Sequence, residues 1–244
     1  MKFLCVSDQI DPLIYSAGIK ERFNNVDAVL CAGDLPLDYV DFIVSSLNKP
    51  TFFVFGNHNL EDFHLYHRPA HTFTSESFNI NSAGAEEAFK GFGHGADYVG
   101  FKSIRAKNLL VKNPVTGKET PLLIAGTSGS IRYNNGINQY TDIQMFIKLL
   151  LLVPSLLANK LRYGRYVDIF LTHAAPRKVH DLEDNCHKGF SCFNWFIKKF
   201  RPSYLVHGHI HLYDSRAERV TDYEGTKVVN AFGYTVIELE NNNG

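Results

Sequence analysis

Five short polar motifs in this chain each follow directly after a run of apolar residues that is typical of a buried β-strand. In chain order, the motifs are Asp8 after FLCVS, Gly33-Asp34 after AVLCA, Gly56-Asn57-His58 after TFFVF, His173 after DIFLT, and Gly208-His209-Ile210-His211 after SYLVH. In an open α/β sheet, the carboxyl ends of the strands form the crevice in which ligands bind. We therefore expect these side chains, which are far apart in the chain, to converge on one site.

The side chains of these motifs form a donor set that suits divalent metal ions. Carboxylate oxygens, a carboxamide oxygen and imidazole nitrogens bind hard to borderline ions, and two ions can share one carboxylate. A structural zinc site would instead show cysteines or histidines paired at short spacing. The four cysteines show no such pairing, so the sequence favours a catalytic, solvent-accessible site; the cysteines are Cys5, Cys31, Cys186 and Cys192.

The order of the motifs resembles that of the calcineurin-like metallophosphoesterase superfamily. In that superfamily Asp-x-His, Gly-Asp, Gly-Asn-His-Asp/Glu, a lone strand-end His and Gly-His-x-His follow one another. Each motif alone is weak, but five in order behind five apolar runs, from Asp8 to His211, are specific. The resemblance implies an α/β fold, namely a four-layer α/β/β/α sandwich of two mixed sheets.

Carried over position by position, the resemblance implies a binuclear metal centre that hydrolyses a phosphoester through a hydroxide bridging the two ions. The divalent ions would be Mn, Fe, Zn or Co, and we favour manganese. The implied ligands are Asp34, shared by both ions, Asp8 and His211 on the first ion, and Asn57, His173 and His209 on the second. His58, which is not a ligand in the family, would stabilise the transition state or protonate the leaving oxygen.

Two positions depart from the family pattern. Ile10 stands where the family has the histidine of Asp-x-His, and an aliphatic side chain cannot coordinate a metal. Asn59 stands where the family has an acid after Gly-Asn-His, so His58 lacks its usual orienting acceptor unless Glu61 or Asp62 replaces it. We expect the first metal to be held weakly and turnover to be slow, or to favour a good leaving group.

Three further residues are candidates for binding the substrate. Arg132 lies in the glycine-rich stretch SGSIRYNNG, and its guanidinium fork suits a phosphate group. Asn134 in the same stretch and His187 are comparable candidates. The substrate itself is left open as a phosphomonoester, a phosphodiester or a nucleotide.

Two other functions compete with a small-molecule phosphoesterase. Ile10 and Asn59 raise the possibility of a catalytically weak or inactive scaffold that has kept the fold. Six converging ligands argue against this interpretation, because buried polar groups are costly to retain without a use. A nuclease is the third interpretation, but the chain has 25 basic and 25 acidic residues and lacks a basic run, so nucleic acid is not the expected partner.

The chain is expected to form one domain over residues 1–244, with a loop or small cap at about 59–96. Alternating apolar runs and amphipathic segments predict helices at about 16–23, 37–47, 141–161 and 189–199. The expected strands are 2–7, 27–32, 51–55, 98–106, 108–112, 121–126, 167–172 and 203–207, followed by two or three antiparallel strands over 215–240 that join at Glu224-Gly225 and bend near Gly233.

The remaining expectations concern location and partners. The apolar stretch before Ser7 is too short for a signal peptide, so we expect a cytoplasmic protein with reduced cysteines. The segment 145–157 is apolar but contains Lys148 and Pro154 and falls short of about 20 apolar residues. A core-facing helix is therefore favoured, and peripheral membrane contact is a secondary expectation. The sequence does not indicate an oligomeric state.

Overall fold

The computed structural model describes residues 1–61, 63–66, 95–113, 117–214 and 216–239. Most of the loop or cap expected at about 59–96 therefore lies outside the described residues, as do residues 114–116 between the expected strands 108–112 and 121–126. Within the first of these segments, the short helix α3 (Phe63–Tyr66) is described, and the strand β4 (Asp97–Tyr98) follows it.

The first sheet has the strand order β13-β1-β2-β3-β4. Its central strands are β1 (Lys2–Ser7), β2 (Ala28–Cys31) and β3 (Thr51–Phe53), and they pair in parallel through the crossover helices α1 (Ile19–Phe23) and α2 (Leu37–Leu47). The edge strand β13 (Gly233–Glu238) pairs with β1 in the antiparallel direction. The sheet is therefore mixed, with its parallel part built largely by the first sixty residues.

The second sheet is also mixed and has the order β11-β12-β10-β9-β6-β5. Its four inner strands are parallel, and both edge strands are antiparallel to their neighbours. The strands are β5 (Lys102–Lys112), β6 (Glu119–Gly126), β9 (Ile169–Leu171), β10 (Tyr204–His207), β11 (Val220–Tyr223) and β12 (Thr226–Asn230). A separate pair, β7 (Ser130–Ile131) and β8 (Gln139–Tyr140), lies in the loop that precedes α5 (Asp142–Tyr163).

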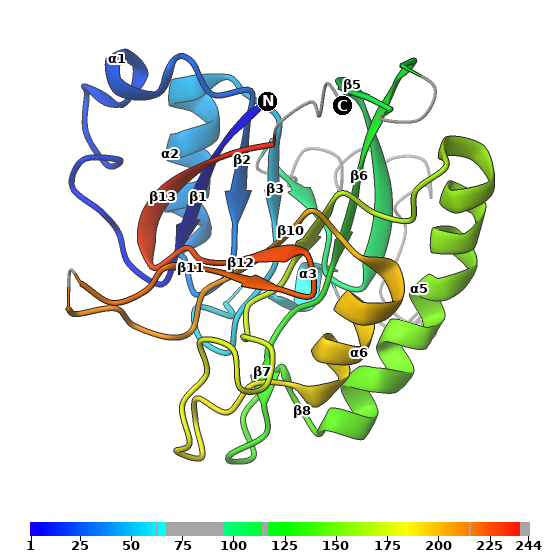
Figure 1. The fold of residues 1–244 in the computed structure, drawn as a ribbon. Coiled ribbons are helices and arrows are strands. Elements are labelled where there is room, and N and C mark those ends of the chain that lie inside the picture. The colour runs from blue at the N-terminus through cyan, green and yellow to red at the C-terminus, as the bar shows by residue number, and fades with distance from the viewer. Residues whose placement is uncertain (62, 67–94, 114–116, 215, 240–244) are drawn as a thin grey trace, which may run out of the picture.

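Three hydrophobic clusters, formed by the residues that the structure describes, fill the spaces between four layers. One cluster lies between the two sheets, and the other two separate the sheets from α1 and α2 on one side and from α5 and α6 (Ser191–Phe200) on the other (Figure 1). The strands alternate between clusters: in β1, Phe3 and Cys5 pack between the sheets, while Leu4 and Val6 pack toward α1 and α2. Successive side chains of a strand point to opposite faces of the sheet, and these strands are apolar on both faces. Each sheet therefore packs against the other sheet on one face and against helices on the other, which gives the expected α/β/β/α sandwich.

The expected helices and strands are confirmed, most of them with shifted ends, apart from two differences. The expected strands 98–106 and 108–112 are largely one strand, β5, whose register slips between Ala106 and Leu110. The tail was expected to form two or three antiparallel strands; β11 and β12 pair with each other in this way, whereas β13 is antiparallel to β1. The β11–β12 hairpin turns at Glu224-Gly225 as expected, but the chain then crosses to the first sheet. The crossing uses the left-handed backbone of Gly233, where φ is 67°.

Candidate metal centre

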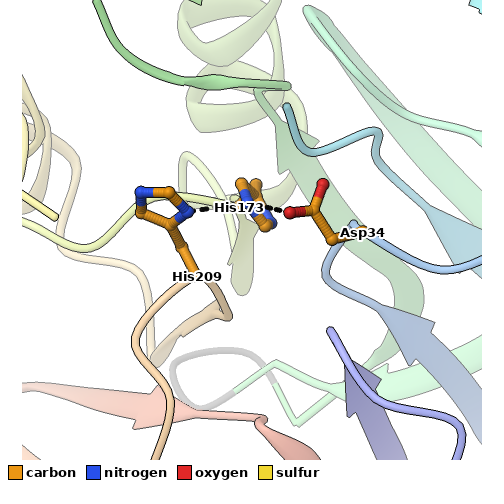
Figure 2. A group of neighbouring side chains, drawn as sticks. All are labelled: Asp34, His173 and His209. Carbon is orange, nitrogen blue, oxygen red and sulfur yellow. Dashed lines mark hydrogen bonds and ion pairs between the residues drawn. The ribbon is translucent and has the colours of Figure 1, made fainter. Parts of the chain in front are cut away.

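The parallel strands of both sheets end at one edge of the sandwich, and the polar motifs lie in the loops that follow them. Asp34 follows β2, and His173 and His209 follow β9 and β10 of the second sheet. Figure 2 shows the imidazole of His173 between the Asp34 carboxylate and the His209 ring. The metal-binding atoms of these three buried residues lie within 4.8 Å of one another. Residues from both sheets are therefore brought together as the sequence predicts.

Three acceptor atoms surround one nitrogen at the centre of this cluster. His173 Nε2 lies 3.3 Å from Asp34 Oδ2, 3.2 Å from Asn57 Oδ1 and 3.1 Å from His209 Nδ1. Asn57 follows β3, so four of the six implied ligands meet here. Together with His173 Nε2, the three acceptor atoms form one tight group of four nitrogen and oxygen atoms, which are the donor types that divalent cations bind.

Hydrogen bonds outside the cluster orient these donors. A backbone carbonyl can only accept, so His173 Nδ1, 2.8 Å from the Ala32 oxygen, carries a proton and leaves Nε2 to face the centre. In the same way, His209 Nε2 donates to the Cys186 carbonyl at 2.8 Å and leaves the Nδ1 lone pair facing inward. Both rings are thus set in the orientation that metal binding requires.

Tyr133 is a site residue that the sequence reasoning missed. Its hydroxyl accepts a hydrogen bond of 3.2 Å from Asn57 Nδ2, which turns the amide oxygen of Asn57 toward the cluster. The available signal was its position between the candidates Arg132 and Asn134. A tyrosine in a loop does not by itself indicate which amide it will orient.

The Asp34 carboxylate is held from two sides. Its Oδ1 accepts the backbone N–H of His58 at 2.7 Å, while Oδ2 faces His173. Asn59, the residue that replaces the family acid, donates its side-chain N–H to the Asp34 carbonyl at 3.1 Å. Asp34 has a left-handed backbone with φ of 54°, a conformation that aspartate tolerates better than most residues. Asn59 therefore supports the loop that carries the central ligand.

Asp8 and His211 form a looser pair at the side of the cluster. His211 Nε2 lies 3.8 Å from Asp8 Oδ1, and both Asp8 oxygens accept the backbone N–H of His209. The His211 ring, 42% exposed, stacks on Phe232 and lies 2.8 Å from the Tyr213 hydroxyl. Among the described residues, this pair stands outside the group formed by Asp34, His173 and His209.

Charge is distributed unevenly over the cluster. Burial disfavours a charged His173 ring, but the nearby Asp34 carboxylate outweighs burial and raises the pKa of His173 to about 9. Burial would raise the pKa of Asp34, yet His173 and the His58 N–H hold it well below its usual range. Burial, together with repulsion from charged His173, lowers the pKa of His209 to about 3. In the metal-free protein, a proton on His173 Nε2 therefore lies among the donor atoms of Asp34, Asn57 and His209.

Metal binding to the metal-free protein is expected to strengthen with pH up to about 9. The cation must displace the His173 proton, so its affinity should rise about tenfold per pH unit below the raised pKa and level off above it. His209 is already neutral in this range and releases no proton. Calorimetric titration with Zn²⁺ in buffers of different ionisation enthalpy measures both affinity and proton release. An affinity that is flat between about pH 7 and 8.5 would contradict this assignment.

The other candidate residues lie around the centre in different ways. The His58 side chain is exposed, next to the backbone N–H that holds Asp34. The His187 ring lies 5.3 Å from the His209 ring, centroid to centroid, and its Nδ1 is 2.9 Å from Asp184. Arg132 donates to the Gln139 carbonyl and the Gln144 side chain, while Asn134 Oδ1 accepts the N–H of Gly136. The structure thus brings His58 and His187 near the cluster, whereas Arg132 is bonded to β8 and α5, and Asn134 to the nearby Gly136. A substrate role stays a prediction for these residues.

Residues 1–213 match the family model described as calcineurin-like phosphoesterase, and the chain belongs to this family. The family implies metal-dependent phosphoester hydrolysis in general. No curated protein matches the chain. Among solved structures, the protein TT1561 of Thermus thermophilus is similar in fold, with a TM-score of 0.57 and 14% identity over 95% of this chain and 88% of that one. A second structure has a TM-score of 0.59 and 14% identity over 97% of this chain and 94% of its own.

Proposed function

We propose that this protein hydrolyses small phosphoesters, whether phosphomonoesters, phosphodiesters or nucleotides, with a pair of divalent metal ions held at the candidate metal centre. The observation that carries the proposal is the convergence of Asp34, Asn57 and His209 donor atoms around His173 Nε2. These donors belong to a chain of the calcineurin-like phosphoesterase family. They suit Mn²⁺, Fe²⁺, Zn²⁺ or Co²⁺, and manganese is the ion we favour.

The proposed division of ligands follows the two groups of side chains. Asn57, His173 and His209 would hold one ion, Asp8 and His211 the other, and Asp34 both. When bound, such ions polarise phosphoryl oxygens and lower the pKa of a bound water toward neutrality. The protein's own contribution is orientation, because Ala32, Cys186 and Tyr133 keep the donor atoms aimed inward before any ion arrives.

His58 is proposed to act on the leaving oxygen. Its backbone N–H donates to Asp34, and its side chain is exposed, so the ring is accessible to a bound substrate. An imidazolium there can give a proton to the departing alkoxide, and this help matters most for a poor leaving group.

Replacing His58 with alanine should therefore slow the hydrolysis of an ester with a poor leaving group more than that of an ester with a good one. The kcat/KM for phenyl phosphate should fall about 100-fold, and that for p-nitrophenyl phosphate less than about tenfold. The control is His64→Ala, which removes another exposed histidine whose Nδ1 lies 3.0 Å from the Glu61 carbonyl. An unchanged rate of His58→Ala on phenyl phosphate would show that His58 has no such role.

The position of Ile10 offers a test of the first metal site. Ile10 is 45% exposed, so a histidine can replace it without opening the core. Ile10→His should supply the ligand that the family motif has, raise the affinity of the weaker site about tenfold or more, and increase turnover at limiting Mn²⁺. The matched control is Leu13→His, which places a histidine at a nearby exposed position that matches no family ligand. Equal metal affinity in Ile10→His and the wild type would contradict a ligand deficit at this position.

The function as a whole is tested by metal analysis of protein purified without chelator, combined with hydrolysis of p-nitrophenyl phosphate and bis-p-nitrophenyl phosphate. We expect bound metal, turnover of at least one ester with added Mn²⁺, and loss of turnover in chelator. Bound metal without turnover of either ester would support a scaffold instead. Failure to bind any of the four metals would overturn both the centre and the function.

A further inference from the structure

The helix α5 presents an apolar face to the outside of the molecule. It forms the outermost element of its layer, at the right edge of Figure 1. Its exposed apolar residues include Ile143 at 72%, Leu151 at 76% and Leu161 at 89%. We call the full set the α5 stripe: Ile143, Ile147, Leu150, Leu151, Leu157 and Leu161. Their spacing places them along one side of a helix about 33 Å long.

The opposite face of α5 holds the helix firmly in the fold. Met145, Leu149, Leu152 and Leu156 are buried in the cluster that α5 shares with α6 and the second sheet. Thr141 and Gln144 form a reciprocal cap at its start. By length and a mean hydropathy of 1.4, α5 is apolar enough to cross a membrane. Crossing would uncover the buried face, so the geometry suits a helix that lies along a surface.

The layer that carries the α5 stripe is strongly basic, although the whole chain is neutral. Residues 142–167 and 191–201 contain seven basic side chains and a single acid, Asp142. Lys160 and Arg162 flank Leu161 in the last turn of α5. Beyond this turn, a pocket of about 170 Å³ is lined by Lys160, Arg165, Lys199 and Arg201. Arg165 is paired with Asp168, which leaves the other cations to set the charge of the rim.

We propose that α5 docks this protein onto an anionic phospholipid surface. The α5 stripe would enter the boundary between headgroups and acyl chains, while Lys160, Arg162 and the pocket cations contact the phosphates. The charge selects this occupant. Arg165 and Lys198 are paired with Asp168 and Glu224, but a second copy of the chain, packed α5 against α5, would still place two layers with excess positive charge against each other. The apolar stripe and the cationic rim are the two features that an interfacial helix combines.

Flotation with phospholipid vesicles tests the proposal on the full chain. With vesicles of phosphatidylcholine and about one third phosphatidylglycerol, the wild type should bind at least about tenfold better than with phosphatidylcholine alone. Leu151→Gln/Leu161→Gln should lose this binding about tenfold or more. The matched control is Leu110→Gln/Val220→Gln, which changes two exposed apolar residues on β5 and β11 and should bind as the wild type does.

A second pair of variants isolates the contribution of charge. Lys160→Gln/Arg162→Gln should weaken binding to the anionic vesicles, whereas Lys20→Gln/Lys118→Gln, on other exposed surfaces, should not. Thermal unfolding of each variant checks that the fold is kept. Hydrolysis of a soluble ester should be unchanged in the α5 stripe variant, so this test is independent of the proposed function.

Three results of the vesicle experiment would overturn the proposal, and a dimerisation result would be a fourth. They are absence of binding to the anionic vesicles, equal binding to both kinds of vesicle, and equal binding of the wild type and Leu151→Gln/Leu161→Gln. Concentration-dependent dimerisation that the same variant abolishes would assign the α5 stripe to a second copy of the chain instead.

Discussion

Asp34→Asn is expected to lower phosphoester hydrolysis by about a thousandfold or more, with a matching loss of bound metal. The amide keeps the shape of the carboxylate but removes the negative charge that faces His173 Nε2 at 3.3 Å. It also removes the charge that raises the pKa of His173, so burial should then lower that pKa. Initial rates with added Mn²⁺, together with the metal content of the purified variant, measure the effect.

The control for this variant is Asp38→Asn. Asp38 is an exposed acid in the first turn of α2, on the same segment that follows β2. Its replacement changes the net charge equally and leaves the candidate centre intact, so rate and metal content should stay close to the wild type. If Asp34→Asn retained both, the convergence of side chains around His173 would have no part in metal binding.

Gly56→Ala is expected to damage both the fold and the centre. A Cβ at position 56 would overlap the Asp34 carboxylate and lie 2.6 Å from His173 Cε1. Neither group can yield, because Asp34 accepts the His58 N–H and His173 is fixed by the Ala32 carbonyl. Overpacking at such a position should lower the free energy of unfolding by about 1–3 kcal/mol. Displaced ligands should also reduce the hydrolysis rate about 100-fold.

Gly18→Ala separates this steric effect from the loss of a glycine. A Cβ at position 18 would meet only the guanidinium end of Arg22, at 3.1 Å, and that flexible side chain can move. Its free energy of unfolding and activity should therefore change little. Urea unfolding and the rate on bis-p-nitrophenyl phosphate report the two effects for both variants. Equal results for Gly56→Ala and Gly18→Ala would mean that the close packing against Asp34 is not needed.

Much of the fold was accessible from local patterns. The strand β1 and the helix α2 have the bounds expected from the sequence, because an unbroken apolar run and an amphipathic segment before Asn48 are both local signals. Which strands pair with each other cannot be predicted from such local signals. The tail was expected to form antiparallel strands, yet its strand β13 pairs with β1, more than two hundred residues away in the chain.

In the candidate metal centre, too, local patterns predicted some residues and not others. The motif positions already indicated that Asp34, Asn57, His173 and His209 would meet, because each follows a strand and strands of this kind end at one edge. The partners that orient them were not accessible. The carbonyls of Ala32 and Cys186 belong to no motif, and Tyr133 is not distinguished in its loop. Hydrogen bonds of this kind depend on distances between segments that no local pattern encodes.

The amino-acid sequence by itself determined the family, the alternation of apolar runs and the residue types available to bind a metal. The tertiary structure decided which of these residues meet: four donors in one tight group, and Asp8 with His211 in a looser pair. It also decided that the α5 stripe faces outward, although its residues are as apolar as those buried on the opposite side. The reason is physical: residue type sets what a side chain can bind, while packing between distant segments sets what it touches and what charge it carries.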